Sequence, residues 1–323
     1  MKDNKILNIR GVVLEKNQLE NYMEKIATDH VITKNSDKNT YPIPRVKENF
    51  EIISYTYQLL NEHVKQNIQI HPAGEWLLDN FYTIEEMYQV ILKELSKRKY
   101  VNFQGLANGI YKGFARIYVL ASEIVAYTDS KINSKNLSEF LQAYQNKKTL
   151  SMEEIWNISL FIQIALMENI RQICERIYVS QIQKYKVQNI TQRLVEGQNK
   201  PKYKNLTDYK TKITNYEDMK YPFIEYMSYK LKKYGRAGYP FLNVLEEQVN
   251  KMGTSISDVI RKEHFDIATK KVSMGNAINS IKTLQRINFQ EIFEKLNGVE
   301  DILKKDPLNV YDNMDYKTKE YYR

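Results

Sequence analysis

The chain has 323 residues, of which 42% are hydrophobic and 27% are charged, so it can bury a sizeable core and is not disordered throughout. Its 11 glycines and 7 prolines are too few for a fold of many short strands and tight turns. The single cysteine, Cys174, excludes an intramolecular disulfide and any zinc site with several cysteine ligands. A net charge of +9 fits either an ordinary lysine-rich surface or a surface for anionic partners.

Two stretches bear on the location of the protein. The first ten residues lack the apolar region of a signal peptide. The longest apolar stretch, 155–170, is interrupted by polar and charged residues and is too short to cross a bilayer. We therefore expect a cytoplasmic protein.

Helical spacing of apolar residues dominates the first 195 residues. After Pro72, the residues Leu77, Phe81, Ile84 and Tyr88 follow the spacing i, i+4, i+7, i+11 and share one helix face. Proline is well suited to the first turn, because its missing N–H would have no helical partner there. A helix is therefore expected to begin at Pro72.

Two further helices are predicted in this part of the chain. One spans about 116–127 and follows a glycine-containing loop. The other begins at Ser151, where Ser151 and Glu154 form a capping box, and runs to about Leu194. Helices of this length bury a stripe against several neighbours.

A polar segment then divides the chain. Residues 196–220 contain Gly197, Pro201 and, between Lys200 and Lys212, five lysines and one aspartate. This composition predicts an exposed linker. We expect an N-terminal helical lobe, 1–195, and a smaller C-terminal helical lobe, 221–323, that is truncated at its end.

The second lobe is also predicted to be helical. Gly253 is placed to close one helix, and Ser255 with Asp258 to cap the next. The expected helices are 221–233, 240–252, 255–270, 274–286 and 289–303. The sequence thus predicts an all-α fold of irregularly stacked helical hairpins in two lobes, without a substantial β-sheet.

The usual enzyme motifs are absent. The chain lacks the phosphate-binding loop, the dinucleotide-binding glycine motif, the zinc-protease HExxH motif and the nucleophile elbow. Its four histidines have no paired metal-ligand spacing, and Cys174 lies in an apolar helical stretch where an inert buried thiol is expected. We predict no catalytic residue, no metal site and no cofactor in this chain.

A few side chains are nevertheless of types that could act in catalysis or bind a sugar. Glu75 and Asp79 share a helix face, and paired carboxylates can do acid–base work on a sugar, although a solvated face is the commoner role. Glu263 and His264 are consecutive and point about 100° apart on a helix, which favours a structural role. The rings of Trp76 and of Trp156 are expected in the core. A small cryptic enzyme built on these groups is one alternative for the function.

Several segments, in consistent order from about Phe50 to Arg323, resemble the cyclic β-1,2-glucan synthases of bacteria. In the N-terminal part the matching segments are Pro72–Glu86 (P-A-x-E-W-L-L-D-N-F-x-x-I-E-E), Ala115–Ser130 (P-R-V-Y…H-T-D-S, from which Ala115 and Tyr127 depart), and Leu150–Arg171 (E-L-W and A-L-I-E-N-L-R). In the C-terminal part they are Gly253–His264 (G-T-T…R-x-E-H), Val272–Ser280 (V-S-V-G-N-x-I-x-S) and Asp306–Arg323 (D-P-x-x-V-Y-x-x-M-D-F-x-T-R-D-x-Y-R).

The resemblance implies a mostly helical region at the cytosolic face of the inner membrane. In that family it is followed by membrane-spanning helices, a family 84 glycosyltransferase domain and a family 94 glycoside hydrolase-type domain, which build β-1,2-glucan from UDP-glucose. These domains would be the partners of this chain, and a membrane would be reached only through the parent protein. No catalytic residue of the family can be carried over, since the motifs of the catalytic domains are absent here.

The first functional hypothesis is thus an accessory or scaffold region of such a synthase that contacts or anchors the growing β-1,2-glucan. Aromatic faces and hydrogen-bonding side chains would make the contact, and the candidates are Trp76, Asp79, Asn80, Arg116, Glu168 and Arg171. The second hypothesis is a free-standing helical adaptor that binds protein or anionic partners through its basic surface. Nucleic acid is not an expected partner.

Overall fold

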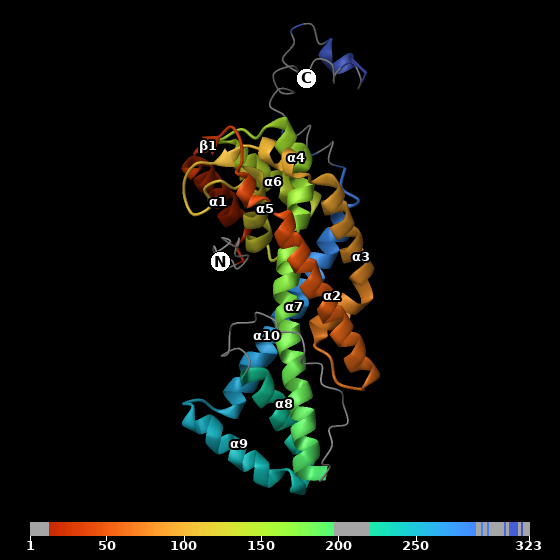
Figure 1. The fold of residues 1–323 in the computed structure, drawn as a ribbon. Coiled ribbons are helices and arrows are strands. Elements are labelled where there is room, and N and C mark those ends of the chain that lie inside the picture. The colour runs from red at the N-terminus through yellow and green to blue at the C-terminus, as the bar shows by residue number, and fades with distance from the viewer. Residues whose placement is uncertain are drawn as a thin grey trace. The chain divides into compact units, whose positions relative to one another are not determined.

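The structure, a computed structural model, describes residues 13–196 and 220–288, together with 292, 296, 307, 310–315 and 318. Helices dominate this part of the chain (Figure 1). The sheet found there consists of two short antiparallel strands, β1 (Ile32–Thr33) and β2 (Gly105–Leu106), with Ile32 opposite Leu106. The predicted all-α fold is confirmed.

The described part of the chain contains the following α-helices. In chain order they are α1 (Lys16–Asp29), α2 (Ile43–Lys65), α3 (Pro72–Glu94), α4 (Lys97–Asn102), α5 (Arg116–Tyr127), α6 (Ser134–Gln145), α7 (Met152–Glu196), α8 (Lys220–Lys233), α9 (Tyr239–Lys251) and α10 (Ile256–Leu284). Single turns of 3₁₀ helix, η1 (Lys38–Thr40), η2 (Gly235–Ala237) and η3 (Tyr311–Asn313), lie between or after them.

The chain divides into two compact units, each built from segments that are distant in the sequence. Unit 1 comprises Met1–Pro42, Ile91–Ala165 and Ser280–Arg323, and unit 2 comprises Ile43–Val90 and Leu166–Asn279. The division into lobes 1–195 and 221–323 stays a prediction, and nearly all of the predicted linker 196–220 lies outside the described residues.

The helix starts that the sequence marks most clearly are confirmed. The helix α3 begins at Pro72, and α5 has both predicted bounds. At the start of α7, the Ser151 N–H donates to the Glu154 carboxylate (2.8 Å) and the Glu154 N–H donates to Ser151 Oγ (3.3 Å). This reciprocal pair satisfies two N–H groups that the first turn leaves without helical partners.

The C-terminal part of the helical prediction needs one correction. The Asp258 N–H donates to Ser255 Oγ (3.1 Å) and Gly253 has a φ of 76°, as expected for a cap and a helix-closing glycine. However, α10 continues without a break to Leu284, so the two predicted helices 255–270 and 274–286 are one. The intervening residues include neither glycine nor proline, and Ser273 and Met274 are buried, so packing holds them helical. The predicted helix 289–303 lies largely outside the described residues.

A buried ion pair links two helices in the core of unit 1. Arg116, at the start of α5, is 1% exposed, and Glu154, in the first turn of α7, is fully buried. Arg116 Nε donates to Glu154 Oε1 (2.9 Å), and the Arg116 Nη2 group donates to the second carboxylate oxygen. The guanidinium also lies over the Tyr144 ring of α6, 5.8 Å from its centroid. One carboxylate thus caps α7 and holds α5.

Removing one partner of this pair leaves a buried charge without compensation, so Glu154→Gln should lower the free energy of unfolding by about 3–5 kcal/mol. The double variant Arg116→Met/Glu154→Met should recover most of that loss, because apolar groups replace both charges. The matched control is Glu153→Gln at the exposed neighbouring position, where a change within about 0.5 kcal/mol is expected. Denaturant unfolding measures all three, and a Glu154→Gln variant as stable as the control would contradict the account.

Candidate functional site

Three of the predicted glycan-binding residues lie on α3 in unit 2. Asp79 is exposed, whereas Trp76 is half-buried. A side chain built at Gly275 of α10 would approach the Trp76 ring to 3.2 Å, so this glycine allows the ring to pack closely against the helix. Asn80 departs from helical geometry (φ −127°, ψ 16°), and its Nδ2 donates to the Trp76 carbonyl (2.9 Å). The kink in α3 is therefore next to the tryptophan.

Glu168 and Arg171 form part of a buried cluster between α2 and α7. Arg171 Nη2 donates to Glu168 Oε1 (2.7 Å), Arg45 Nη2 donates to the same oxygen (3.0 Å), and Asn49 Nδ2 donates to Oε2 (2.7 Å). Burial raises the pKa of the Glu168 carboxyl, but Arg45, Arg171 and Asn49 outweigh it and hold the pKa below its usual value. One carboxylate thereby fastens α2 to α7.

Arg116, the remaining predicted residue, belongs to unit 1 and is paired with Glu154 as described above. The structure thus brings Trp76 together with Asn80, and Glu168 with Arg171, and it holds Arg116 in another unit. The partners that we observe for Arg116, Glu168 and Arg171 are other protein side chains. Glycan contact by the six predicted residues stays a prediction.

Two other expectations concern the tryptophans and the paired carboxylates. The expectation that Trp156 lies in the core is wrong, since 47% of the residue is exposed. The first turns of α7 bury Glu154, Ile155 and Ile158, which places Trp156 on the solvent side of the helix. Glu75 and Asp79 are both exposed.

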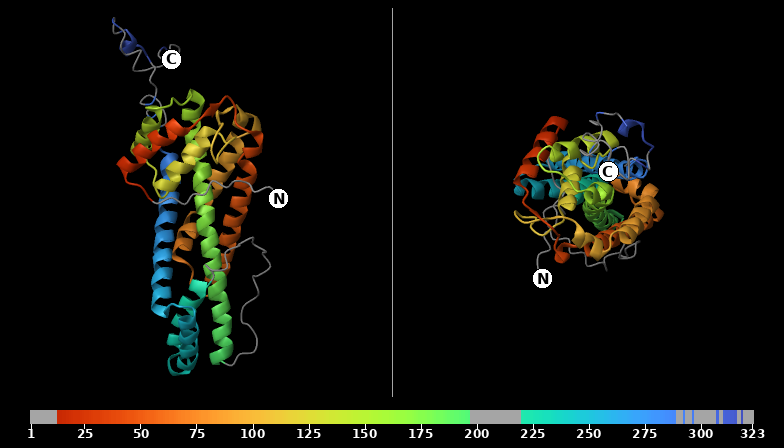
Figure 2. Two further views of the ribbon diagram at one scale, coloured as in Figure 1. Left: turned by 90° about the vertical axis from the view of Figure 1, so that its left-hand side faces the viewer. Right: turned by 90° about the horizontal axis from the view of Figure 1, so that it is seen from above.

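Glu263 and His264 have separate surroundings, as their positions on α10 predict. Glu263 is 2% exposed and accepts from Arg176 Nη2 of α7 (2.5 Å), whereas Arg176 Nε donates to Asp266 (2.5 Å). The exposed His264 faces Glu225 of α8 at 3.5 Å. The left view of Figure 2 shows α10 running alongside α7, and the pair of Arg176 with Glu263 joins the two helices. Burial, with Asp266 and Glu225 nearby, raises the pKa of Glu263 to about 7 although Arg176 opposes the shift.

Residues that carry the family resemblance pair with one another across long stretches of sequence. Arg116 of one segment binds Glu154 of another, 38 residues away. Asn169 Nδ2 donates to Ser273 Oγ (3.4 Å), and Trp76 packs at Gly275. In unit 1, Ser280 Oγ donates to the Ser130 carbonyl (2.5 Å) and accepts from the Ile132 N–H (2.8 Å). The resembling segments therefore contain several of the contacts that join helices within each unit.

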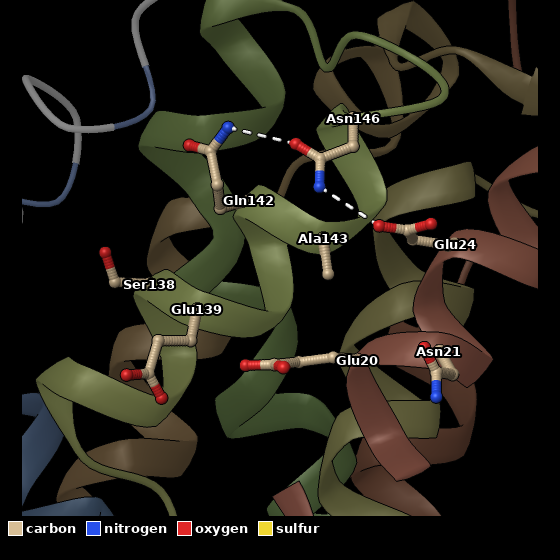
Figure 3. A pocket seen from close by; sticks show the side chains of 8 residues that line it. All are labelled: Glu20, Asn21, Glu24, Ser138, Glu139, Gln142, Ala143 and Asn146. Atoms are coloured by element: carbon tan, nitrogen blue, oxygen red, sulfur yellow. Dashed lines mark hydrogen bonds between the residues drawn. The ribbon is translucent and has the colours of Figure 1, made fainter. Parts of the chain in front are cut away.

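A polar groove lies between α1 and α6 in unit 1, and no motif in the sequence predicts it. Its volume is about 460 Å³, and its lining residues are Glu20, Asn21, Glu24, Ser138, Glu139, Gln142, Ala143 and Asn146. Figure 3 shows Gln142, Asn146 and Glu24 joined in a row, with the short Ala143 side chain in the middle of the group. Asn146 Nδ2 donates to Glu24 Oε1 (3.1 Å) and Gln142 Nε2 to Asn146 Oδ1 (3.4 Å).

The charges around the groove are largely balanced. Lys16 Nζ lies 2.8 Å from Glu139, and Lys147 Nζ lies 3.5 Å from Glu24. The hydrogen bond from Asn146, aided by Lys147, lowers the pKa of Glu24. The groove therefore offers ionised carboxylates as acceptors and amides as donors. A neutral molecule with several hydroxyl groups can use both.

Among the described residues, 13–196, 220–288 and the few beyond them, no three or more His, Cys, Asp or Glu side chains form a group suited to hold a metal ion. No helix in this part of the chain has the length and apolar character to cross a membrane. Cys174 is buried, and burial raises the pKa of its thiol, so the reactive thiolate is disfavoured.

Comparison with known proteins gives one informative similarity. No protein-family model matches the chain. Over 282 residues it is 23% identical to the cyclic beta-(1,2)-glucan synthase NdvB of Rhizobium meliloti (strain 1021). The match covers 86% of this chain but 10% of NdvB, so the chain spans about a tenth of the length of this curated relative. The predicted resemblance is thus confirmed as similarity to one segment of a cyclic glucan synthase.

The raised pKa of Glu263 predicts a pH-dependent contribution to stability. Because the folded pKa of about 7 exceeds the ordinary value of 4.5, the folded state favours the protonated carboxyl, and its contribution is lost as the pH rises between these values. Glu263→Gln cannot lose a proton, so its stability relative to the natural chain should increase by about 1–3 kcal/mol from about pH 5 to pH 8. Thermal unfolding across this range measures the difference. Glu246→Gln, on the exposed side of α9, is the control, and a pH-independent difference for Glu263→Gln would contradict the assignment.

Proposed function

We propose that the chain is a helical, non-catalytic scaffold region of a glucan synthase-like glycosyltransferase. The observation that carries the proposal is that residues of the resembling segments, such as Arg116 with Glu154 and Asn169 with Ser273, are one another's partners within the units. Residues that pair with one another maintain a fold, whereas the residues of a catalytic segment would converge on a substrate. The similarity to NdvB supplies the class of the parent protein.

In this proposal, synthesis of β-1,2-glucan from UDP-glucose takes place in other domains of the parent protein. The partners of the chain are those glycosyltransferase and membrane domains, and its location is the cytoplasmic face of the membrane. The chain itself uses no cofactor. The buried carboxylates Glu154, Glu168 and Glu263 each fasten one helix to another, which gives the region the rigidity that a scaffold needs.

The proposal is tested on the complete gene product that contains the chain. Membranes or protein containing it should incorporate glucose from UDP-glucose into β-1,2-glucan, and the 323-residue chain alone should not. Glu168→Gln should lower total synthesis only in proportion to the loss of folded protein, because it weakens the link between α2 and α7 by a few kcal/mol.

The matched control for that variant is Asp79→Asn on the exposed face of α3, which should leave both folded yield and synthesis unchanged. A gene product that makes no glucan would contradict the proposal. A Glu168→Gln protein that folds in full yield but has lost glucan synthesis would also contradict the proposal, because that outcome would give Glu168 a direct part in catalysis.

A second role, contact with the growing glucan, is supported by the groove between α1 and α6. Its volume of about 460 Å³ lies in the range of small-molecule sites, and its mixture of carboxylates and amides suits hydroxyl groups. The carboxylates of Glu24 and Glu139 would accept hydrogen bonds from sugar hydroxyls, and Gln142 would donate. The groove is thus a second candidate site for glycan contact, besides the six residues predicted from the sequence.

Titration of the chain with a linear β-1,2-linked gluco-oligosaccharide tests the groove. Each of Glu24→Gln and Glu139→Gln should weaken binding by about tenfold, since each replaces a charged acceptor by a neutral one. Glu94→Gln, an exposed position of the same unit outside the groove, should bind like the natural chain. Calorimetry or chemical-shift changes provide the measurement, and binding that is equally tight in all variants would exclude the groove.

A further inference from the structure

The helix α10 carries an exposed apolar stripe that no contact within unit 2 explains. Phe265, Ala268 and Val272 follow the spacing i, i+3, i+7, so they lie along one face of the helix, and Arg261 continues this face by one turn. All of them are exposed, and the two large apolar side chains, Phe265 and Val272, are 74% and 59% exposed. A contact on this face would remove apolar surface from water, which is favourable.

The opposite face of the same helix is fully engaged with the protein. Val259, Glu263, Ser273 and Met274 are buried. Glu263 binds Arg176 of α7, and Ser273 accepts from Asn169 of α7. The helix is thereby fixed along α7 while its outer stripe faces solvent. An apolar stripe held this way is presented rigidly and needs no rearrangement to make a contact.

Basic side chains flank the stripe. Lys262 and Lys271 are exposed, and on a helix they project to opposite sides of Phe265, at about 60° and about 120° from it. Lys270, which is partly exposed, lies nearer the buried side, and Lys262 Nζ lies over the Tyr221 ring of α8, 5.7 Å from its centroid. Arg261 itself is 80% exposed and pairs with Asp258 at 2.8 Å. Asp266, the nearest carboxylate on the partly buried side, is engaged with Arg176. The stripe is therefore bordered by more positive than negative charge.

Apolar side chains between lysines are the arrangement with which a helix lies on an anionic bilayer surface. The apolar residues enter the boundary between headgroups and acyl chains, and the lysines extend sideways to the phosphates. A protein partner would also be attracted to the charge, but two large apolar side chains about two helical turns apart with lysines beside them match the boundary between headgroups and acyl chains. We propose that the Phe265–Val272 face of α10 docks on an anionic membrane surface.

The proposed contact is weak and salt-dependent. Two apolar side chains and a few lysines give a reversible association that needs both the apolar and the electrostatic contribution. Raising the salt concentration screens the lysines and should release the protein, since exposed charges interact over about 8–10 Å at moderate ionic strength. Such a contact orients a domain at a membrane without anchoring it.

Co-sedimentation of the chain with vesicles tests the proposal. The chain should bind vesicles of phosphatidylcholine with about a third phosphatidylglycerol at low salt, and should not bind pure phosphatidylcholine. The double variant Phe265→Ala/Val272→Thr should lose at least about tenfold in binding, and high salt should abolish binding by the natural chain. Because both positions are exposed, the variants should unfold at the same temperature as the natural chain.

The matched control is Tyr82→Ala, an aromatic residue that is 76% exposed on α3 of the same unit, beside the exposed carboxylates Asp79 and Glu86. This variant should bind as the natural chain does. Absence of binding to the anionic vesicles would overturn the proposal. Binding that Phe265→Ala/Val272→Thr leaves unchanged would also overturn it, and would assign the attraction to the general positive charge of the chain. The scaffold proposal is tested by measuring glucan synthesis, so neither result of the vesicle experiment bears on it.

Discussion

Buried pairs of a carboxylate with a guanidinium are the interaction on which the rest of the structure depends. Glu154 binds Arg116, Glu168 binds Arg45 and Arg171, and Glu263 binds Arg176. Each carboxylate is almost fully buried, so each is tied to its partner by the high cost of leaving a charge alone in the interior. Each pair also has a defined geometry, which apolar packing alone would not impose. The pairs therefore specify which helices meet and in which register.

Several of these carboxylates lie in segments that resemble the glucan synthases. In the stretch Ala165–Arg171, Glu168 and Arg171 bind each other, and Glu168 also accepts from Asn49 of α2. Some of the resembling residues therefore lie where helices are joined. The polar groove between α1 and α6 and the outer stripe of α10 are separate from these ion pairs.

Local signals in the sequence predicted much of the fold. The start of α3 at its proline, the capping box of α7 and the bounds of α5 are determined by residues close together in the sequence, and the sequence predicts them correctly. The continuity of α10 was missed, because packing of Ser273 and Met274 overrides the weak local preference. Arg176 and Glu263 are 87 positions apart in the sequence, and local residue spacing does not predict that they pair. For the same reason neither the discontinuous units nor the groove between α1 and α6 could be predicted from one sequence.

The central claim is that the residues shared with the glucan synthases act as structural partners. A double-mutant cycle on Arg171 and Glu168, which both lie in a resembling segment, tests it most directly, using Arg171→Met, Glu168→Gln and the double variant, with the free energy of unfolding as the readout. The account predicts that each single variant is destabilised and that the two losses fall short of additivity by about 1–3 kcal/mol. Additive losses, or single variants as stable as the natural chain, would contradict it.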